Sequence, residues 1–249
     1  MKKFFMFLAV IGFVALAAND VVAQTNDAAA QELMAGAASD APVYQQIKAK
    51  FIDGGVGFMA AVLLCLILGL AVAIERIIYL SLSTTNTSKL IAKVEEALNN
   101  GGVEAALEVC RNTRGPVASI FYQGLSRMDQ GLEAVEKSVV SYGGVQAAQL
   151  ETGLTWLSLF IAMSPNLGFL GTVIGMIGAF DAIQAAGDIS PIVVASGIKV
   201  ALITTVAGLI VALILQVFFN YITSKVESLV ITMEDASVSL IDILVKAKK

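Results

Sequence analysis

Two threonines in long uncharged stretches, Thr172 and Thr205, are the side chains best placed to do chemistry. Each lies within an apolar run that could cross a bilayer, whose hydrocarbon core takes about 20 helical residues. A hydroxyl at that depth can donate and accept hydrogen bonds where water is scarce. If several copies of the chain ring an axis, these hydroxyls form one or two polar collars in a mostly apolar lumen. Thr204 and Lys199, close by in sequence, are further candidates for lining it.

Small residues in the same two runs predict the helix contact that positions these hydroxyls. They repeat three or four residues apart, so each set falls on one helical face and lets another helix approach closely in lipid. The first set is Gly168, Gly171, Gly175 and Gly178, and the second is Gly197, Ala201 and Gly208, with Thr205 between the last two. Pro165 removes a backbone donor, which a membrane helix tolerates only where neighbouring groups satisfy the freed carbonyl. We expect Thr172 to supply a hydroxyl nearby.

The composition indicates an integral membrane protein. The 249 residues are 57% hydrophobic and 14% charged, and the mean hydropathy is +0.81. A net charge of −4 without a Lys/Arg cluster argues against nucleic acid as a partner. The absence of histidine and of clustered carboxylates argues against an enzyme, a metal site or a cofactor. Cys65 and Cys110 are expected to be free thiols.

Hydropathy and breaker residues predict an all-α membrane protein with three transmembrane helices and long cytoplasmic helical extensions. The N-terminal apolar core is too short for a comfortable span, which favours a cleavable signal peptide over an uncleaved anchor. The expected segments are a signal peptide 1–23, a flexible periplasmic segment with a short interfacial helix 24–55, a first span 56–81, a cytoplasmic helical domain 82–150, a second span 151–182, a periplasmic turn 183–191, a third span 192–222 and a cytoplasmic helical tail 223–249.

Charge asymmetry predicts the orientation. Lysines and arginines fall in the region after the first span and in the tail, whereas the 183–191 turn has none. Because positive residues stay on the cytoplasmic side, the mature N-terminus is expected outside and the C-terminus inside. Glu75 and Arg76 at the end of the first span are expected to anchor it to the membrane interface, with Arg76 reaching the lipid headgroups.

Three spans make a poor channel alone, so the sequence implies an oligomeric ring. The cores of the second and third spans contain no Asp or Glu. If the protein moves protons, a titratable carboxylate must therefore come from another chain. A carboxylate in hydrocarbon is costly enough to be functional by default.

The run from Leu170 to Met176 closely resembles a segment of the MotA/TolQ/ExbB proton-channel family. A second block, Gly197 to Leu209 followed by Asn220, is similar to the third-helix signature of that family. The resemblance covers about residues 57 to 228. It implies a pentamer in the bacterial inner membrane, around an ExbD-like single-span subunit that carries a membrane aspartate and works with a TonB-like periplasmic transducer.

The resemblance is closest to ExbB and predicts an ion-driven motor subunit that energises outer-membrane transport. A TolQ-like role in envelope constriction is an alternative within the family. A non-conducting structural subunit of a secretion complex is an alternative from another class, and a substrate transporter is disfavoured by the few polar groups. Many relatives carry a glutamate at the place of Val200, whereas this chain has Lys199 beside it. Lys199 either reaches outward to the interface or faces the lumen, and the conducted ion stays open.

Overall fold

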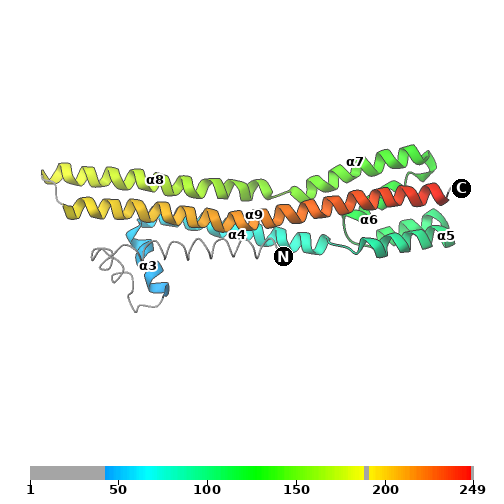
Figure 1. Cartoon of the computed structure of the whole chain (residues 1–249), viewed down its shortest axis with the longest axis horizontal. Coiled ribbons are helices and arrows are strands. Elements are labelled where there is room, and N and C mark those ends of the chain that lie inside the picture. The colour runs from blue at the N-terminus through cyan, green and yellow to red at the C-terminus, as the bar shows by residue number, and fades with distance from the viewer. Residues whose placement is uncertain (1–42, 188–190, 248–249) are drawn as a thin grey trace, which may run out of the picture. The chain divides into compact units, whose positions relative to one another are not determined.

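The computed structural model describes residues 43–187 and 191–247 (Figure 1). The predicted signal peptide, most of the predicted flexible segment and the centre of the predicted periplasmic turn lie outside these ranges. The chain forms two units, of which the first contains α3 (Val43–Asp53). The second unit comprises residues 57–249.

The second unit is built from helices. In chain order they are α4 (Val56–Ser83), α5 (Thr87–Arg111), α6 (Pro116–Leu125), the 3₁₀ turn η1 (Met128–Gln130), α7 (Leu132–Glu151), α8 (Leu154–Ala186) and α9 (Pro191–Ala247). The described part of the chain has no strand, and three of its helical stretches are long and apolar enough to cross a membrane. This confirms the predicted all-α architecture with three spans.

Helices α8 and α9 form the longest contact in the structure and run side by side in opposite directions (Figure 1). At 1.5 Å per residue, the 57 residues of α9 extend about 85 Å, against about 30 Å of bilayer hydrocarbon. The helix therefore continues far beyond the membrane. Helix α4 contacts the pair through Gly69, since a β-carbon there would overlap the side chain of Leu215 on α9.

Outside the membrane, α5, α6 and α7 pack around the second half of α9. Their shared core includes Val94, Phe121 and Val135, all fully buried. The buried residues of α9 recur every three or four positions, which gives one apolar helical face. They are Val226, Leu229, Met233, Ala236, Leu240, Ile243 and Leu244.

Some of the helix breaks fall at glycines where the sequence pattern favours a break, and others do not. Gly102 interrupts α5 with a non-helical φ of 73°, as the Asn-Asn-Gly-Gly pattern predicts. The glycine pair Gly143–Gly144 could bend a helix, but α7 runs through both residues. The break falls instead at Gly153, whose φ of 88° suits glycine and separates α7 from α8. Helix α8 ends at Ala186, so the turn begins later than the predicted residue 183.

Both cysteines are free, as the sequence predicts, and both are buried. Cys110 lies at the end of α5 in the core outside the membrane. Burial raises the pKa of its thiol from 9.0 to about 11, because the charged thiolate is poorly solvated there.

We therefore expect Cys110 to react with iodoacetamide at pH 8 at least about tenfold more slowly in the folded protein than in urea, since the thiolate is the reactive form. The folded rate should climb as the pH rises from 9 towards 11. The unfolded thiol ionises first, so folding stability should be full below about pH 9 and fall as the pH passes through 11. Mass spectrometry of the Cys110 peptide measures the rate; equal labelling at pH 8 in both states would contradict the buried position.

Candidate functional site

The α8–α9 contact brings two backbones close together across glycines. A β-carbon at Gly168 would lie 2.9 Å from the carbonyl oxygen of Thr204 and 3.2 Å from the Cα of Thr205. One at Gly208 would lie 2.5 Å from the carbonyl oxygen of Ser164. Since these neighbours are backbone atoms, which cannot swing away, only glycine fits at either position at this helix separation.

The rest of the contact continues along α8 towards its end. Gly171 lies against the side chain of Thr204, Gly175 against Ala201, and Gly197 against Ala179. Gly178, the fourth glycine of the predicted set on α8, is not part of the contact, because a β-carbon there would meet nothing within 4 Å. Within one chain the seam therefore comprises Gly168, Gly171, Gly175 and Ala179 of α8, with Gly197, Ala201, Thr204 and Gly208 of α9.

Pro165 lies inside α8, one residue after the fully buried Ser164. The Ser164 hydroxyl donates to the carbonyl of Phe160 at 2.8 Å. The carbonyl that Pro165 deprives of its usual donor is that of Ile161, four residues earlier. The Thr172 hydroxyl is directed elsewhere, to Gly168, so it does not play the compensating part that the sequence suggested for it.

Four oxygen atoms meet where Thr172 of α8 lies beside Thr205 of α9. The two hydroxyls are within hydrogen-bonding distance of each other. Thr172 Oγ1 is also 3.0 Å from the carbonyl oxygen of Ala201 and 3.2 Å from that of Gly168. Thr205 Oγ1 is 3.4 Å from the Ala201 oxygen and 3.5 Å from the Gly168 oxygen. Here we call these four groups the threonine cluster.

The threonine cluster has more acceptors than donors. Each hydroxyl has one hydrogen and two lone pairs, and each carbonyl accepts only. The two hydrogens can therefore be shared among several acceptors by rotation of the hydroxyls, at little cost in heavy-atom movement. Thr172 and Thr205 are both partly exposed. Such a cluster can donate to a carboxylate that approaches it, or accept from a protonated carboxylic acid.

Thr204 and Lys199 are not part of this cluster. Thr204 is 1% exposed and donates to the Ala201 carbonyl at 2.8 Å, so α8 covers it and it faces the seam, which differs from the expectation that it lines a lumen. Lys199 is exposed near the start of α9. It precedes Thr205 by six residues, which places it about a third of a turn round the helix from the Thr205 side chain.

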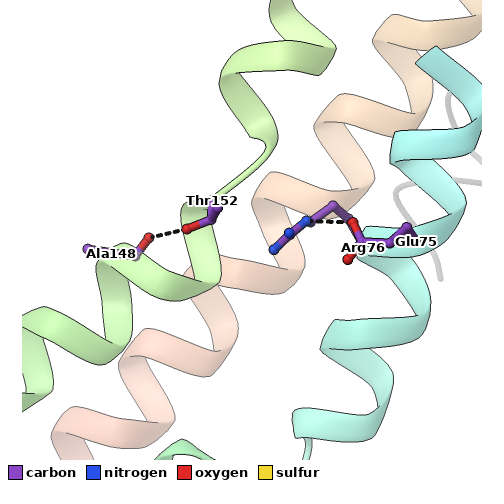
Figure 2. A network of polar contacts seen from close by, with 4 residues as sticks. All are labelled: Glu75, Arg76, Ala148 and Thr152. Atoms are coloured by element: carbon purple, nitrogen blue, oxygen red, sulfur yellow. Dashed lines mark hydrogen bonds and ion pairs between the residues drawn. The ribbon is translucent and has the colours of Figure 1, made fainter. Parts of the chain in front are cut away.

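Arg76 connects the end of the first span to the break between α7 and α8. Its Nε lies 2.8 Å from Oε2 of Glu75, an ion pair without aligned hydrogen-bond geometry (Figure 2). The guanidinium carbon is 5.3 Å from the ring centroid of Tyr79, within cation–π range. The Arg76 side chain also packs on Gly153, where a β-carbon would lie 2.8 Å from Nε. The residue is therefore mostly buried among protein groups.

The helices and the threonine cluster define an all-helical membrane protein whose second and third spans are joined by a glycine seam with hydroxyls at its edge. Within that class, the chain belongs to the MotA/TolQ/ExbB proton channel family, whose sequence profile matches residues 112–235. This confirms the family that the sequence motifs indicate. The matched region contains the whole glycine seam and the threonine cluster.

Curated relatives carry ExbB names. An ExbB-like protein of Synechocystis is 30% identical over 179 residues, which cover 70% of each chain. An ExbB homolog of Methanothermobacter thermautotrophicus is 35% identical over 162 residues, covering 65% of this chain and 57% of that relative. The biopolymer transport protein exbB1 of Vibrio cholerae is 47% identical over 68 residues, covering 27% of this chain and 30% of the relative. This chain thus spans less than two thirds of the length of the last two.

The close approach at Gly208 predicts a sharp difference between two glycine-to-alanine variants. Gly208→Ala should lower the thermal unfolding midpoint in detergent by several degrees, because overpacking against backbone costs roughly 1–3 kcal/mol. Gly178→Ala is the matched control, since it adds the same methyl group where nothing lies within 4 Å. Its midpoint should be unchanged or higher; equal losses in the two variants would contradict the seam.

Proposed function

We propose that this protein is the pore-forming subunit of an ion-driven motor in the bacterial inner membrane, of the ExbB type. Copies of the chain form a ring, a pentamer by analogy with the family, and the ring surrounds a single-span partner that carries a carboxylate. Proton passage drives movement of that partner, which energises outer-membrane transport through a TonB-like periplasmic protein. The observation that carries the proposal is the threonine cluster.

The cluster suits a proton relay better than a structural role alone. If the α8–α9 edge that carries Thr172 and Thr205 faces the ring axis, the hydroxyls offer donors to an ionised carboxylate and acceptors to a protonated one. Their hydrogens already have alternative acceptors in the Gly168 and Ala201 carbonyls. Release of the carboxylate therefore leaves no hydroxyl without a hydrogen-bond partner. The free-energy difference between the bound and released states is then small.

The carboxylate must come from a partner because the spans of this chain contain none near the cluster. The membrane potential contributes about 2.3 kcal/mol per charge per 100 mV, which is enough to bias protonation steps at successive clusters round a ring. The names of the curated relatives, biopolymer transport proteins, support a role in energised transport.

Charge supports an orientation with α5, α6, α7 and the second half of α9 in the cytoplasm. In this orientation the Glu75–Arg76 pair lies at the cytoplasmic end of the first span. Its contact with Gly153 ties that end to the start of α8, so the pair anchors the helix through protein contacts as well as at the interface. Lys199 then lies near the periplasmic end of the third span, where it reaches towards headgroups or the mouth of the lumen.

A TolQ-like role in envelope constriction fits the same geometry with a different periplasmic partner. A non-conducting structural subunit would also use the glycine seam. It would, however, have no need of paired hydroxyls with alternative acceptors, and its activity would be indifferent to their removal.

Removing the hydroxyls one at a time tests the proposal. In the purified complex reconstituted into liposomes, Thr172→Val and Thr205→Val should each lower proton influx at least about tenfold, measured with an enclosed pH-sensitive dye under an imposed potential. Each valine keeps the shape of threonine but loses the hydroxyl, so the complex should assemble at the wild-type size.

Two matched variants separate chemistry from packing. Thr172→Ser retains the hydroxyl and should keep most of the flux. Thr204→Val removes a hydroxyl that is buried in the seam and should also conduct. Full flux in both Thr172→Val and Thr205→Val would refute the relay and favour the structural alternative.

A further inference from the structure

The outer face of α9 keeps an apolar stripe well beyond the membrane. Ile231, Val238 and Val245 are 58%, 62% and 40% exposed and recur every seven residues. They lie opposite the buried face of the helix that contains Met233 and Leu240. Lipid cannot cover this part of α9, because the bilayer accounts for only about 20 residues of a span. A seven-residue apolar repeat is the pattern by which helices pack on one another.

A second exposed apolar position lies on α7. Val140 is 69% exposed and lines a shallow hollow of about 410 Å³. The other residues of the hollow are Glu133, Glu136, Lys137 and Ser141. An apolar side chain beside a lysine, at the edge of a hollow, is suited to receive an apolar residue flanked by carboxylates.

The two surfaces lie at the same level along the bundle. A β-carbon at Gly124 of α6 would contact both Val139 of α7 and Leu240 of α9. These residues therefore lie at the same height along the helix axes, which we call a level. Val140 is therefore level with Val238 to Leu240. Helices α7 and α9 run in opposite directions (Figure 1), so Lys137, one turn away, is level with Asp242, and Glu133, two turns away, is level with Lys246.

Rotation about an axis parallel to the helices moves a residue sideways and leaves its level unchanged. In a ring of copies, the stripe of one subunit can therefore meet the hollow of the next with Val238 on Val140. The same arrangement sets Asp242 near Lys137 and Lys246 near Glu133, which pairs opposite charges twice. Glu136, the remaining charge of the hollow, projects about 100° round α7 from Lys137.

Pairing of α9 with α9 of another copy is disfavoured by charge. Four exposed carboxylates flank the stripe, those of Glu227, Glu234, Asp235 and Asp242, and a two-fold contact would bring them together. A contact between two different faces avoids this repulsion and generates a ring.

We propose that the stripe Ile231–Val238–Val245 of each copy packs against the Val140 hollow on α7 of the next copy, outside the membrane, with Val238 on Val140 at its centre. This inference rests on the proposed ring and names the surfaces that hold it together. The Lys137–Asp242 and Glu133–Lys246 pairs set its register.

Disulfide trapping tests the contact. In the chain carrying both Val140→Cys and Val238→Cys, oxidation with copper phenanthroline in native membranes should give a ladder of covalent multimers on non-reducing gels. Cys65 and Cys110 are buried and should not contribute. Each single variant should give no ladder. The matched control pairs Val140→Cys with Ile231→Cys, which lies on the same stripe about 10 Å from Val238, too far for a disulfide.

Charge exchange tests the register independently. Lys137→Glu in the Val140/Val238 cysteine pair should lower the multimer yield several-fold, because it opposes Asp242 with a like charge. Adding Asp242→Lys should restore the yield. No loss on the first change, or no recovery on the second, would overturn the assigned register.

Glutaraldehyde treatment of the same membranes distinguishes failure of this subunit contact from failure of the ring itself. Multimers with glutaraldehyde but none with the cysteine pair, or equal yields from the offset pair, would overturn this contact and leave the ring standing. A disulfide formed only within one chain, seen as a faster-moving monomer, would likewise overturn it. Monomers under both treatments would overturn the ring and the proposed function with it.

Discussion

The close approach of α8 and α9 at Gly168 and Gly208 is the constraint on which the rest of the structure depends. Side chains at either position would meet the backbone of the opposite helix, and any added separation would draw Thr172 away from Thr205 and the Ala201 carbonyl. In lipid there is no hydrophobic force between apolar helices, so this interlocking of backbone and small side chains is what holds the pair at that distance. The hydroxyl cluster is thus a consequence of the glycine seam.

The same seam suggests how a chain with no Asp or Glu in the cores of its second and third spans could take part in the proposed proton movement. Its contribution is a set of oxygens whose two hydrogens have several acceptors at once. Outside the membrane, the unbroken helix α9 carries the geometry of the seam into the bundle of α5, α6 and α7. In the proposed ring, one continuous helix would thus connect the threonine cluster to the subunit contact on the outer face of α9.

The spans, the absence of strands in the described residues and the glycine seam follow from hydropathy and small-residue spacing, which act locally. Other features depend on tertiary contacts that spacing leaves open. Thr204 and Thr205 both continue the three-and-four repeat of Gly197, Ala201 and Gly208, so the sequence could not decide which of them α8 covers. Gly178 fits the repeat on α8, but Ala179 is the residue that meets α9 there. The break at Gly153 does not follow from local sequence, because Gly143–Gly144 is the stronger helix-breaking signal and Gly153 packs against Arg76 of a helix distant in sequence.

Native mass spectrometry of the complex extracted gently from its own membranes tests the central claim most directly. We expect several copies of this chain in one particle, together with a smaller number of a single-span protein that has one aspartate or glutamate within its span. A particle that contains such a partner would supply the carboxylate that this chain lacks in the cores of its second and third spans. A ring of this chain alone, or a monomer, with no carboxylate-bearing span bound after gentle extraction, would contradict the claim that the cluster serves a proton carried by another chain.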